Sequence, residues 1–218
     1  MPRSKPAPAP DSPAADAAAA AGLGTEAPVT DTRTRLLQAA AAEFIDHGYA
    51  HTDTNRIARR AGFAPQTFYR WYRDKVHVFV EVHRAWEEAE WAMLEALFTQ
   101  HAEGTQIAEA CVEGHRSFLL FRRHLRQLAV EHPLVRAARA ETRRRQLTEL
   151  RRWNPALDDE EAAALLVQFE RLCDALAEGE FADLGLSGSG AMRALARVIE
   201  ELRPRPEAQR GASTPGSS

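Results

Sequence analysis

The chain has 218 residues, of which 44% are hydrophobic, so it is long enough to bury a sizeable core in one medium domain or two small ones. Its net charge of −3 argues against a protein that coats nucleic acid without specificity. It has no apolar run long enough for a transmembrane helix, and its two distant cysteines, Cys111 and Cys173, favour free thiols in a reducing compartment, so we expect a cytoplasmic protein.

Both ends of the chain are rich in small residues and proline. Residues 1–28 consist mainly of Ala, Pro, Ser, Asp and Gly, and residues 204–218 are similar. Segments of this composition bury too little apolar surface to fold. The sequence therefore predicts a disordered arm and a disordered tail, and the arm lacks the Leu-rich stretch of a secretory signal.

Between these ends the apolar residues recur at helical spacing. A first helix is predicted to start at Thr30 or Asp31, either of which can cap it, and to stop at Gly48. Its apolar positions are Leu36, Leu37, Ala40, Ala41, Phe44 and Ile45.

Two short helices are predicted next. Residues 52–54 can cap the second helix, which ends at Gly62. Pro65 fits the first turn of a third helix that runs through Trp71, because the missing N–H of proline has no helical partner there. Phe63 and Phe68, with Tyr72, are expected to pack the three helices together.

The remainder of the chain is also predicted to be helical. Asp74 can cap a fourth helix over residues 75–101. Further helices are expected over 105–131 and 133–153, from Asp158 after a break at Pro155, and from the loop 185–190 to a point before Pro204. No stretch alternates with period two. The predicted fold is all-α: a helix-turn-helix DNA-binding domain over 29–75 and a helical ligand-binding and dimerisation domain over 76–203.

The third helix has the residue types that read DNA. Gly62 allows the left-handed turn that a helix-turn-helix needs between its second and third helices. Gln66 can pair with adenine, the Thr67 methyl can touch thymine, and Tyr69 suits a phosphate oxygen; Arg70 is expected on the same face. Residues 54–75 hold six basic residues and one acid, a balance of +5 that the net charge conceals.

Three further side chains are predicted to contact the DNA backbone. Lys75 lies in the first turn of the fourth helix, where its ammonium and the helix N–H groups can hold a phosphate together. Thr52 can act similarly at the start of the second helix. Trp71 either packs on the sugar-phosphate backbone or lies against the first helix.

The segment from Thr32 to Val82 resembles the N-terminal domain of the tetracycline-repressor (TetR) family. The features that match are AAAAEFIDHGY, Thr52, IARRAG, TFYRWY and Lys75, in this order. The resemblance implies a homodimer, a palindromic double-stranded DNA operator and a C-terminal domain whose small-molecule ligand releases the DNA. It places DNA contacts at Thr52, Gln66, Thr67, Tyr69 and Lys75.

The chain departs from the family pattern at two positions. Ala64 stands where members often carry Ser or Thr, so the third helix has no side-chain cap, which Pro65 offsets in part. Trp71 stands where members often carry His.

A set of aromatic and polar residues in the second domain has two possible roles. They could line a ligand cavity, or they could form an ordinary hydrophobic core, and the sequence does not favour the cavity over the core. A cavity lined by aromatic side chains, with Cys111 or His115 as a polar handle, suits a drug-sized hydrophobic molecule. The candidates are Trp86, Trp91, Cys111, His115, Phe118 and Phe121.

The last two helices have wide apolar stripes, which the resemblance assigns to a four-helix dimer interface. The candidates are Leu165, Leu166, Phe169, Leu172, Leu195, Val198 and Ile199. Some of these must face the core of their own subunit.

Two consecutive segments have opposite charge. Residues 116–152 hold eleven Arg and three Glu, and residues 158–183 hold nine acids and one Arg. The basic segment could form a second nucleic-acid surface, attract an anionic ligand, or neutralise the acidic segment. We favour neutralisation, because helices joined by a short loop pack antiparallel.

No cofactor and no metal site is predicted. His83 and Glu87 lie one turn apart and could ligate a metal, but a polar helix face is the simpler interpretation. An enzyme is a rival hypothesis, but the chain has no G-x-S-x-G, HExxH, Gly-rich phosphate loop or Cys-x-x-Cys. A helical scaffold with a vestigial DNA head is another, and an activator is as compatible with the sequence as a repressor.

Overall fold

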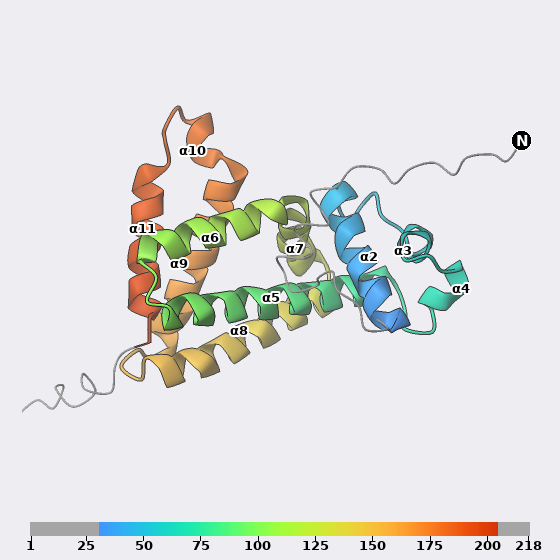
Figure 1. The fold of residues 1–218 in the computed structure, drawn as a ribbon, viewed down its shortest axis with the longest axis horizontal. Coiled ribbons are helices and arrows are strands. Elements are labelled where there is room, and N and C mark those ends of the chain that lie inside the picture. The colour runs from blue at the N-terminus through green and yellow to red at the C-terminus, as the bar shows by residue number, and fades with distance from the viewer. Residues whose placement is uncertain (1–30, 205–218) are drawn as a thin grey trace, which may run out of the picture.

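A computed structural model describes residues 31–204, so the arm predicted over 1–28 and all but the first residue of the tail predicted over 204–218 lie outside the described residues. Every regular element within 31–204 is a helix (Figure 1), as the sequence predicts. The helices are α2 (Thr32–His47), α3 (Thr54–Arg60), α4 (Pro65–Phe68), α5 (Lys75–Thr99), α6 (Gly104–Ser117), α7 (Leu119–Glu131), α8 (Pro133–Trp153), α9 (Asp159–Glu178), α10 (Glu180–Asp183) and α11 (Ser189–Leu202).

Aspartates begin four of these helices. Asp31, Asp53, Asp74 and Asp158 each have extended backbone angles and accept a hydrogen bond from a backbone N–H in the first turn that follows. Each side chain thereby satisfies one of the N–H groups that have no partner inside the helix. The predicted starts of these helices are confirmed, and of the two caps left open for α2 the structure uses Asp31.

The helix predicted over 105–131 is wrong as a single element. It breaks at Phe118, whose backbone angles of φ −111° and ψ 22° are not helical, and the chain continues as α7 in a new direction. No proline or glycine marks the break. Its reason is tertiary, because α6 packs on α9 and α11 whereas α7 packs on α2 and α8. The third helix is also shorter than predicted, since α4 ends at Phe68 and residues 69–71 form a turn. The short α10 was not predicted.

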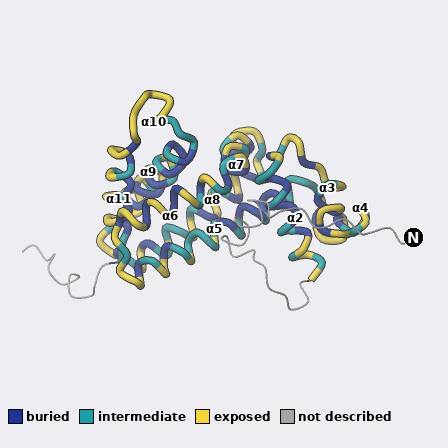
Figure 2. Tube along the Cα trace, turned by 45° about the horizontal axis from the view of Figure 1, so that its top comes forward, coloured by how far each residue is buried: buried dark blue, intermediate teal, exposed yellow. Residues whose placement is uncertain are grey.

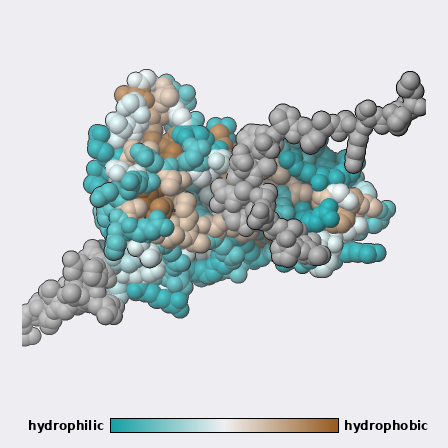
Figure 3. Space-filling model, viewed as in Figure 1, coloured by the Kyte–Doolittle hydropathy of each residue, from teal (hydrophilic) through white to brown (hydrophobic). Residues whose placement is uncertain are grey.

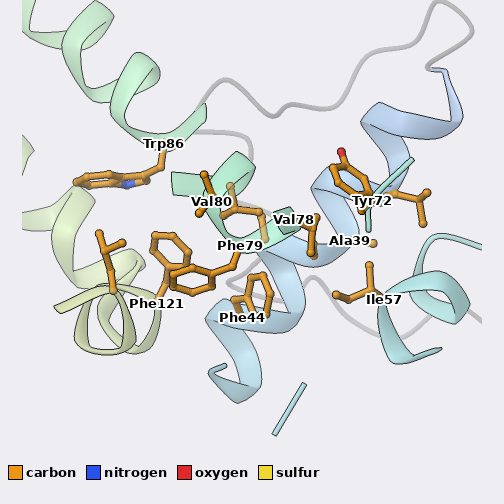
Figure 4. Packing of buried hydrophobic residues seen from close by; sticks show 14 of the residues in the cluster. Ala39, Phe44, Ile57, Tyr72, Val78, Phe79, Val80, Trp86 and Phe121 are labelled. Atoms are coloured by element: carbon orange, nitrogen blue, oxygen red, sulfur yellow. The ribbon is translucent and has the colours of Figure 1, made fainter. Parts of the chain in front are cut away.

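Two buried apolar clusters form the core. The first joins α2, α3 and α4 to the start of α5, to α7 and to the start of α8. Figure 4 shows its centre, where Phe44 of α2, Phe79 of α5 and Phe121 of α7 meet, with ring centroids of Phe79 and Phe121 4.6 Å apart. The second cluster joins the ends of α5 and α8 to α6, α9 and α11. The long helices α5 and α8 therefore connect both clusters.

Exposed residues lie along the outer faces of the helices and at both ends of the molecule. Figure 2 shows exposed segments around α3 and α4 at one end and around the α10 loop at the other. Within residues 31–204, none of the helices combines the length and apolar character needed to cross a membrane.

Candidate nucleic-acid interface and internal cavity

The turn between α3 and α4 is built by a glycine cap. Gly62 has φ +77°, in the left-handed region that side chains avoid. Its N–H donates to the Arg59 carbonyl, and the Phe63 N–H donates to the Ala58 carbonyl at 2.9 Å, which is the Schellman pattern. The turn directs the chain into α4, whose start at Ala64 has no side-chain cap, as predicted.

The outward face of α4 and the turn after it is largely exposed. Gln66 and Arg70 are exposed, and the side chains of Tyr69 and Trp71 are 58% and 43% exposed. Thr67 is half-buried. The Tyr69 hydroxyl is 2.9 Å from the Thr54 hydroxyl at the start of α3. Phe68 and Tyr72, on the opposite face, are buried and anchor the helix to the first cluster, as expected.

Two side chains predicted to contact phosphates, Thr52 and Lys75, hydrogen-bond the protein's own backbone. Thr52 is 2% exposed, and its hydroxyl donates to the backbone carbonyls of Glu43 and Gly48. The Lys75 ammonium donates to the carbonyls of Tyr49 and Thr52 at 2.8 and 2.9 Å. Both side chains therefore hold the loop between α2 and α3, where polar backbone groups need partners.

The Lys75 ammonium also lies 3.9 Å from the centre of the Tyr49 ring, in a cation–π contact. Burial lowers the pKa of Lys75.

Not all of the basic residues over 54–75 are free to face DNA. Arg56 and Arg60 both pair with the buried carboxylate of Glu43, and Arg73 pairs with Asp74. Arg59 and Arg70 are exposed and make no ion pair with any residue in the described range. The charge available to phosphates is consequently smaller than the +5 counted from the sequence.

A cavity of about 30 Å³ lies between the helices of the second cluster. Its lining includes an apolar part, formed by residues such as Leu94, Phe98 and Leu150, and a polar part with Glu87, Glu90, His115, Arg122, Arg143, Gln146 and Glu170. This volume holds about one water molecule. A larger molecule can enter only if the helices separate.

Two of the six predicted ligand residues, Trp91 and His115, line this cavity. The other four do not: Phe118 and Phe121 belong to the first cluster, as does Trp86, and Cys111 is fully buried in the second. Burial raises the pKa of the Cys111 thiol, so the thiol stays protonated.

A buried ionic network surrounds the polar part of the cavity. Arg122 is 2% exposed and donates to both Asp174 and Glu170 of α9. His115 bridges Asp174 and Glu90 with its two ring nitrogens, at 2.8 and 3.0 Å. Burial works against the charged form of Asp174, but the hydrogen bond with His115 and the charge of Arg122 outweigh it and lower its pKa.

The network confirms neutralisation of the acidic segment by the basic one, within a single chain. Arg122, Arg139 and Arg143 all pair with Glu170. Arg126 of α7 pairs with Asp174.

The sequence did not single out these acids as lining a cavity. The sequence feature that pointed to ion pairing was the opposite charge of residues 116–152 and 158–183. This feature does not specify which side chains meet. The interpretation of His83 and Glu87 as a polar helix face is also wrong, because His83 is 1% exposed and the Glu87 side chain 11%.

The apolar residues of α9 and α11 that were predicted to form the dimer interface lie mostly inside the subunit. Leu165, Leu166, Phe169, Leu195, Val198 and Ile199 are all buried in the second cluster, and Leu172 packs against it. The apolar side chains that remain exposed near α9 and α11 are Val167, Leu184 and Leu186, at 59%, 72% and 57%. Figure 3 shows apolar surface at the end of the molecule formed by α9, α10 and α11.

Comparison with known proteins identifies relatives of the N-terminal part. Residues 36–82 match the family described as bacterial regulatory proteins, tetR family. The uncharacterised helix-turn-helix transcriptional regulator YdgC of Bacillus subtilis is 29% identical over 76 residues, which are 35% of this chain and 39% of YdgC. The alignment therefore spans well under half of that relative. Both are described as regulatory proteins.

Solved structures share the fold over most of the chain. A chain from Mesorhizobium loti assigned to the TetR family superposes with a TM-score of 0.57 at 22% identity, covering 78% of this chain and 94% of its own. FadR of Thermus thermophilus, a TetR-family repressor solved in complex with lauroyl-CoA, has a TM-score of 0.51 at 20% identity and covers 85% of this chain and 100% of its own. At these identities the likeness shows the fold alone.

Proposed function

We propose, from the match of residues 36–82 to the tetR family of bacterial regulatory proteins, that the chain is a ligand-responsive transcriptional repressor. It would bind a palindromic operator in double-stranded DNA as a homodimer, and a small molecule would release it. The proposed domains are a DNA-binding domain over 29–75 and a ligand-binding and dimerisation domain over 76–203. The proposed place of action is the cytoplasm, where bacterial DNA lies.

The exposed face of α4 carries the proposal. Gln66 is exposed on α4, and Tyr69, Arg70 and Trp71 are exposed in the turn after it. The Gly62 turn and the buried Phe68 hold this segment at a fixed angle. A helix presented in this way can enter the major groove. Gln66 would read a base, with Thr67 beside it, and Tyr69 and Arg70 would hold phosphates. Thr52 and Lys75 would support the loop behind this face instead of contacting DNA.

Helix α5 connects the proposed DNA-binding face to the cavity. It has 25 residues and is therefore about 37 Å long. It begins at Lys75, beside the loop that supports α3, and it lines the cavity from Glu87 to Phe98. Because the cavity is small, an effector would have to move α5 or α8 to enter. A ligand that binds better to this opened state would shift the population away from the DNA-binding one.

The proposed dimer uses the outer face of α9 and the loop between α10 and α11. The apolar residues left exposed there, Val167 on α9 with Leu184 and Leu186 in the loop, replace the buried stripe expected from the sequence. A two-fold axis at this end would bring two copies of α4 onto one side of the dimer, as a palindromic operator requires.

The test is operator binding by the purified protein. Genomic fragments that the protein retains are selected, and the affinity for one of them is measured by gel shift. We expect Gln66→Ala to weaken binding about tenfold or more, since a bidentate base contact contributes about 1–3 kcal/mol. Tyr69→Phe, which removes only the hydroxyl, should also weaken it.

Gln127→Ala is the matched control. Gln127 is exposed on α7 and far along the chain from the proposed interface. Retention of no genomic fragment by the wild-type protein, or equal affinity of the Gln66→Ala and Gln127→Ala variants, would contradict the proposal.

A further inference from the structure

The internal cavity continues into a surface groove. A groove of about 260 Å³ runs between α5 and α8, and it shares Glu87, Trp91 and Gln146 with the lining of the cavity. These three residues therefore stand where the groove meets the interior. A molecule that enters from solvent at this point passes them before it reaches the apolar part formed by Leu94 and Phe98.

The groove is acidic. Four carboxylates and one basic side chain line it: Glu87, Glu88, Glu95, Glu149 and Arg145. Arg145 already pairs with Glu88 at 3.0 Å. Glu149 pairs with Arg152, outside the groove, and Glu95 makes no ion pair with any residue of the range 31–204.

Glu87, at the inner end, makes no ion pair with an arginine or lysine among residues 31–204. Its nearest basic group is His83, whose Nδ1 is 3.8 Å from Oε1, beyond hydrogen-bonding distance. Burial, helped by the charge of Arg122, lowers the pKa of His83 to about 3, so this imidazole is neutral. The Gln146 amide donates to Glu87 at 2.9 Å. A buried carboxylate with only an amide partner is costly, because such charges are normally paired.

Two polar atoms beside Glu87 also lack partners. The Oε1 of Gln146 and the Nε1 of Trp91 are both buried, and neither has a hydrogen-bond partner among the described residues. The Trp91 N–H is a donor and therefore gives no support for a cation, whereas the Gln146 oxygen is an acceptor that, together with the ionised Glu87 carboxylate, calls for a donor. The Trp91 ring stacks on Trp153, with centroids 4.6 Å apart and planes 13° from parallel.

The basic residues of the cavity do not provide a site for an anion. Arg122 donates to Asp174 and Glu170, and Arg143 donates to Glu170. Both guanidinium groups are therefore already hydrogen-bonded to carboxylates of α9. An anionic ligand would therefore meet Glu87 and Glu90 without a free cation to receive it.

We infer that the effector is a lipophilic amine, bound with its ammonium group between the Glu87 carboxylate and the Gln146 carbonyl. Its apolar body would pass Trp91 and reach Leu94, Phe98 and Leu150. The ammonium would form charge-assisted hydrogen bonds with Glu87 and Gln146 and a cation–π contact with the ring of Trp91. This inference rests on the proposed function, because it names the ligand class of the proposed effector cavity.

The experiment compares three probes of nearly the same shape: phenylbutylamine, phenylbutanol and phenylbutyrate. Binding to the full-length wild-type protein is followed by tryptophan fluorescence and by calorimetry. We expect the amine to bind about tenfold or more tightly than both the alcohol and the carboxylate. Equal affinities for the three probes, tightest binding of the carboxylate, or no binding of the amine would overturn the inference.

Glu87→Gln locates the site. This variant should lose the preference for the amine and bind the alcohol as the wild type does. Glu113→Gln, which removes an exposed carboxylate on α6, is the control and should keep the preference. Circular dichroism of each variant establishes that it is folded. If the Glu87→Gln variant still prefers the amine, the ammonium binds elsewhere and the assignment to Glu87 is wrong.

The two proposals fail separately. Selective amine binding without release of a retained operator fragment would remove the effector part of the proposed function and keep the amine site. If the protein binds an operator fragment but does not bind the amine, the amine site is wrong and the proposed DNA-binding function stands.

Discussion

At the scale of single residues, polar side chains near the proposed DNA-binding face have structural partners that their positions in the sequence do not reveal. Thr52 and Lys75 satisfy backbone carbonyls of the loop between α2 and α3. Because each buried carbonyl needs a donor, these two side chains fix the loop on which α3 and α4 depend. Their proposed contribution to DNA binding is therefore positional.

Glu87 gives a residue-scale prediction about stability. Burial, together with the negative charge of Glu90, raises its pKa from 4.5 to about 7, and the charges of Arg122 and Arg143 oppose this rise. The folded protein therefore holds a proton that the unfolded chain has already lost between these two pH values. Stability is lost as the pH rises through this window.

The Glu87→Gln substitution should remove this loss of stability with rising pH. The free energy of unfolding of the variant, relative to the wild type, should rise between pH 4.5 and 8 by on the order of 1–3 kcal/mol. Urea unfolding at several pH values measures it. Glu88→Gln, on the next residue of α5, is the control for the loss of one negative charge from the helix. Parallel pH profiles for wild type and Glu87→Gln would show that Glu87 is ionised without penalty.

At the scale of elements, helix ends follow local chemistry and helix directions follow packing. Four aspartates cap helices where the sequence places them, but α4 begins at Ala64 with no side-chain cap. Helix α4 has four residues, so most of its stability comes from Phe68 in the core and from the Gly62 turn.

Ala64→Ser should therefore stabilise the N-terminal domain. Ala64 has φ −66° and ψ 148°, the extended geometry from which a serine hydroxyl accepts a bond from the first turn. We expect a gain of about 0.5–1 kcal/mol in the free energy of unfolding, measured by urea titration. Ala64→Val, which adds no acceptor and suits the extended backbone, is the control. A Ser variant no more stable than the Val variant would show that the N–H groups of α4 already have partners.

At the scale of the whole molecule, α5 and α8 run side by side and connect the two clusters (Figure 1). The groove lies between them and both line the cavity, so a ligand there contacts the two helices that join the proposed DNA-binding and effector regions. The apolar surface over α9 to α11 lies at the end of the molecule away from α3 and α4. We propose that the second subunit binds there.

A charge placed in that surface should break the dimer. Val167 is 59% exposed on α9, so Val167→Asp should leave the fold intact and shift the protein toward monomer, because an unpaired carboxylate would be buried at the interface. Sedimentation velocity measures the shift. Val130→Asp is the matched control, since Val130 is 73% exposed on α7. A monomeric wild type, or variants that both sediment as dimers, would contradict the proposed interface.

The sequence by itself determined the all-helical fold, the caps, the Gly62 turn and the resemblance of residues 32–82 to a DNA-binding domain. These features depend on hydrogen bonds and apolar spacing within a few residues, so neighbouring letters encode them. Only the tertiary structure decided the break at Phe118, the burial of the stripe on α9 and α11, and the positions of Glu87 and the ionic network. His115 and Asp174, for example, are 59 residues apart. Burial and ion pairing depend on which distant helices meet, and opposite charges in two segments do not specify which side chains touch.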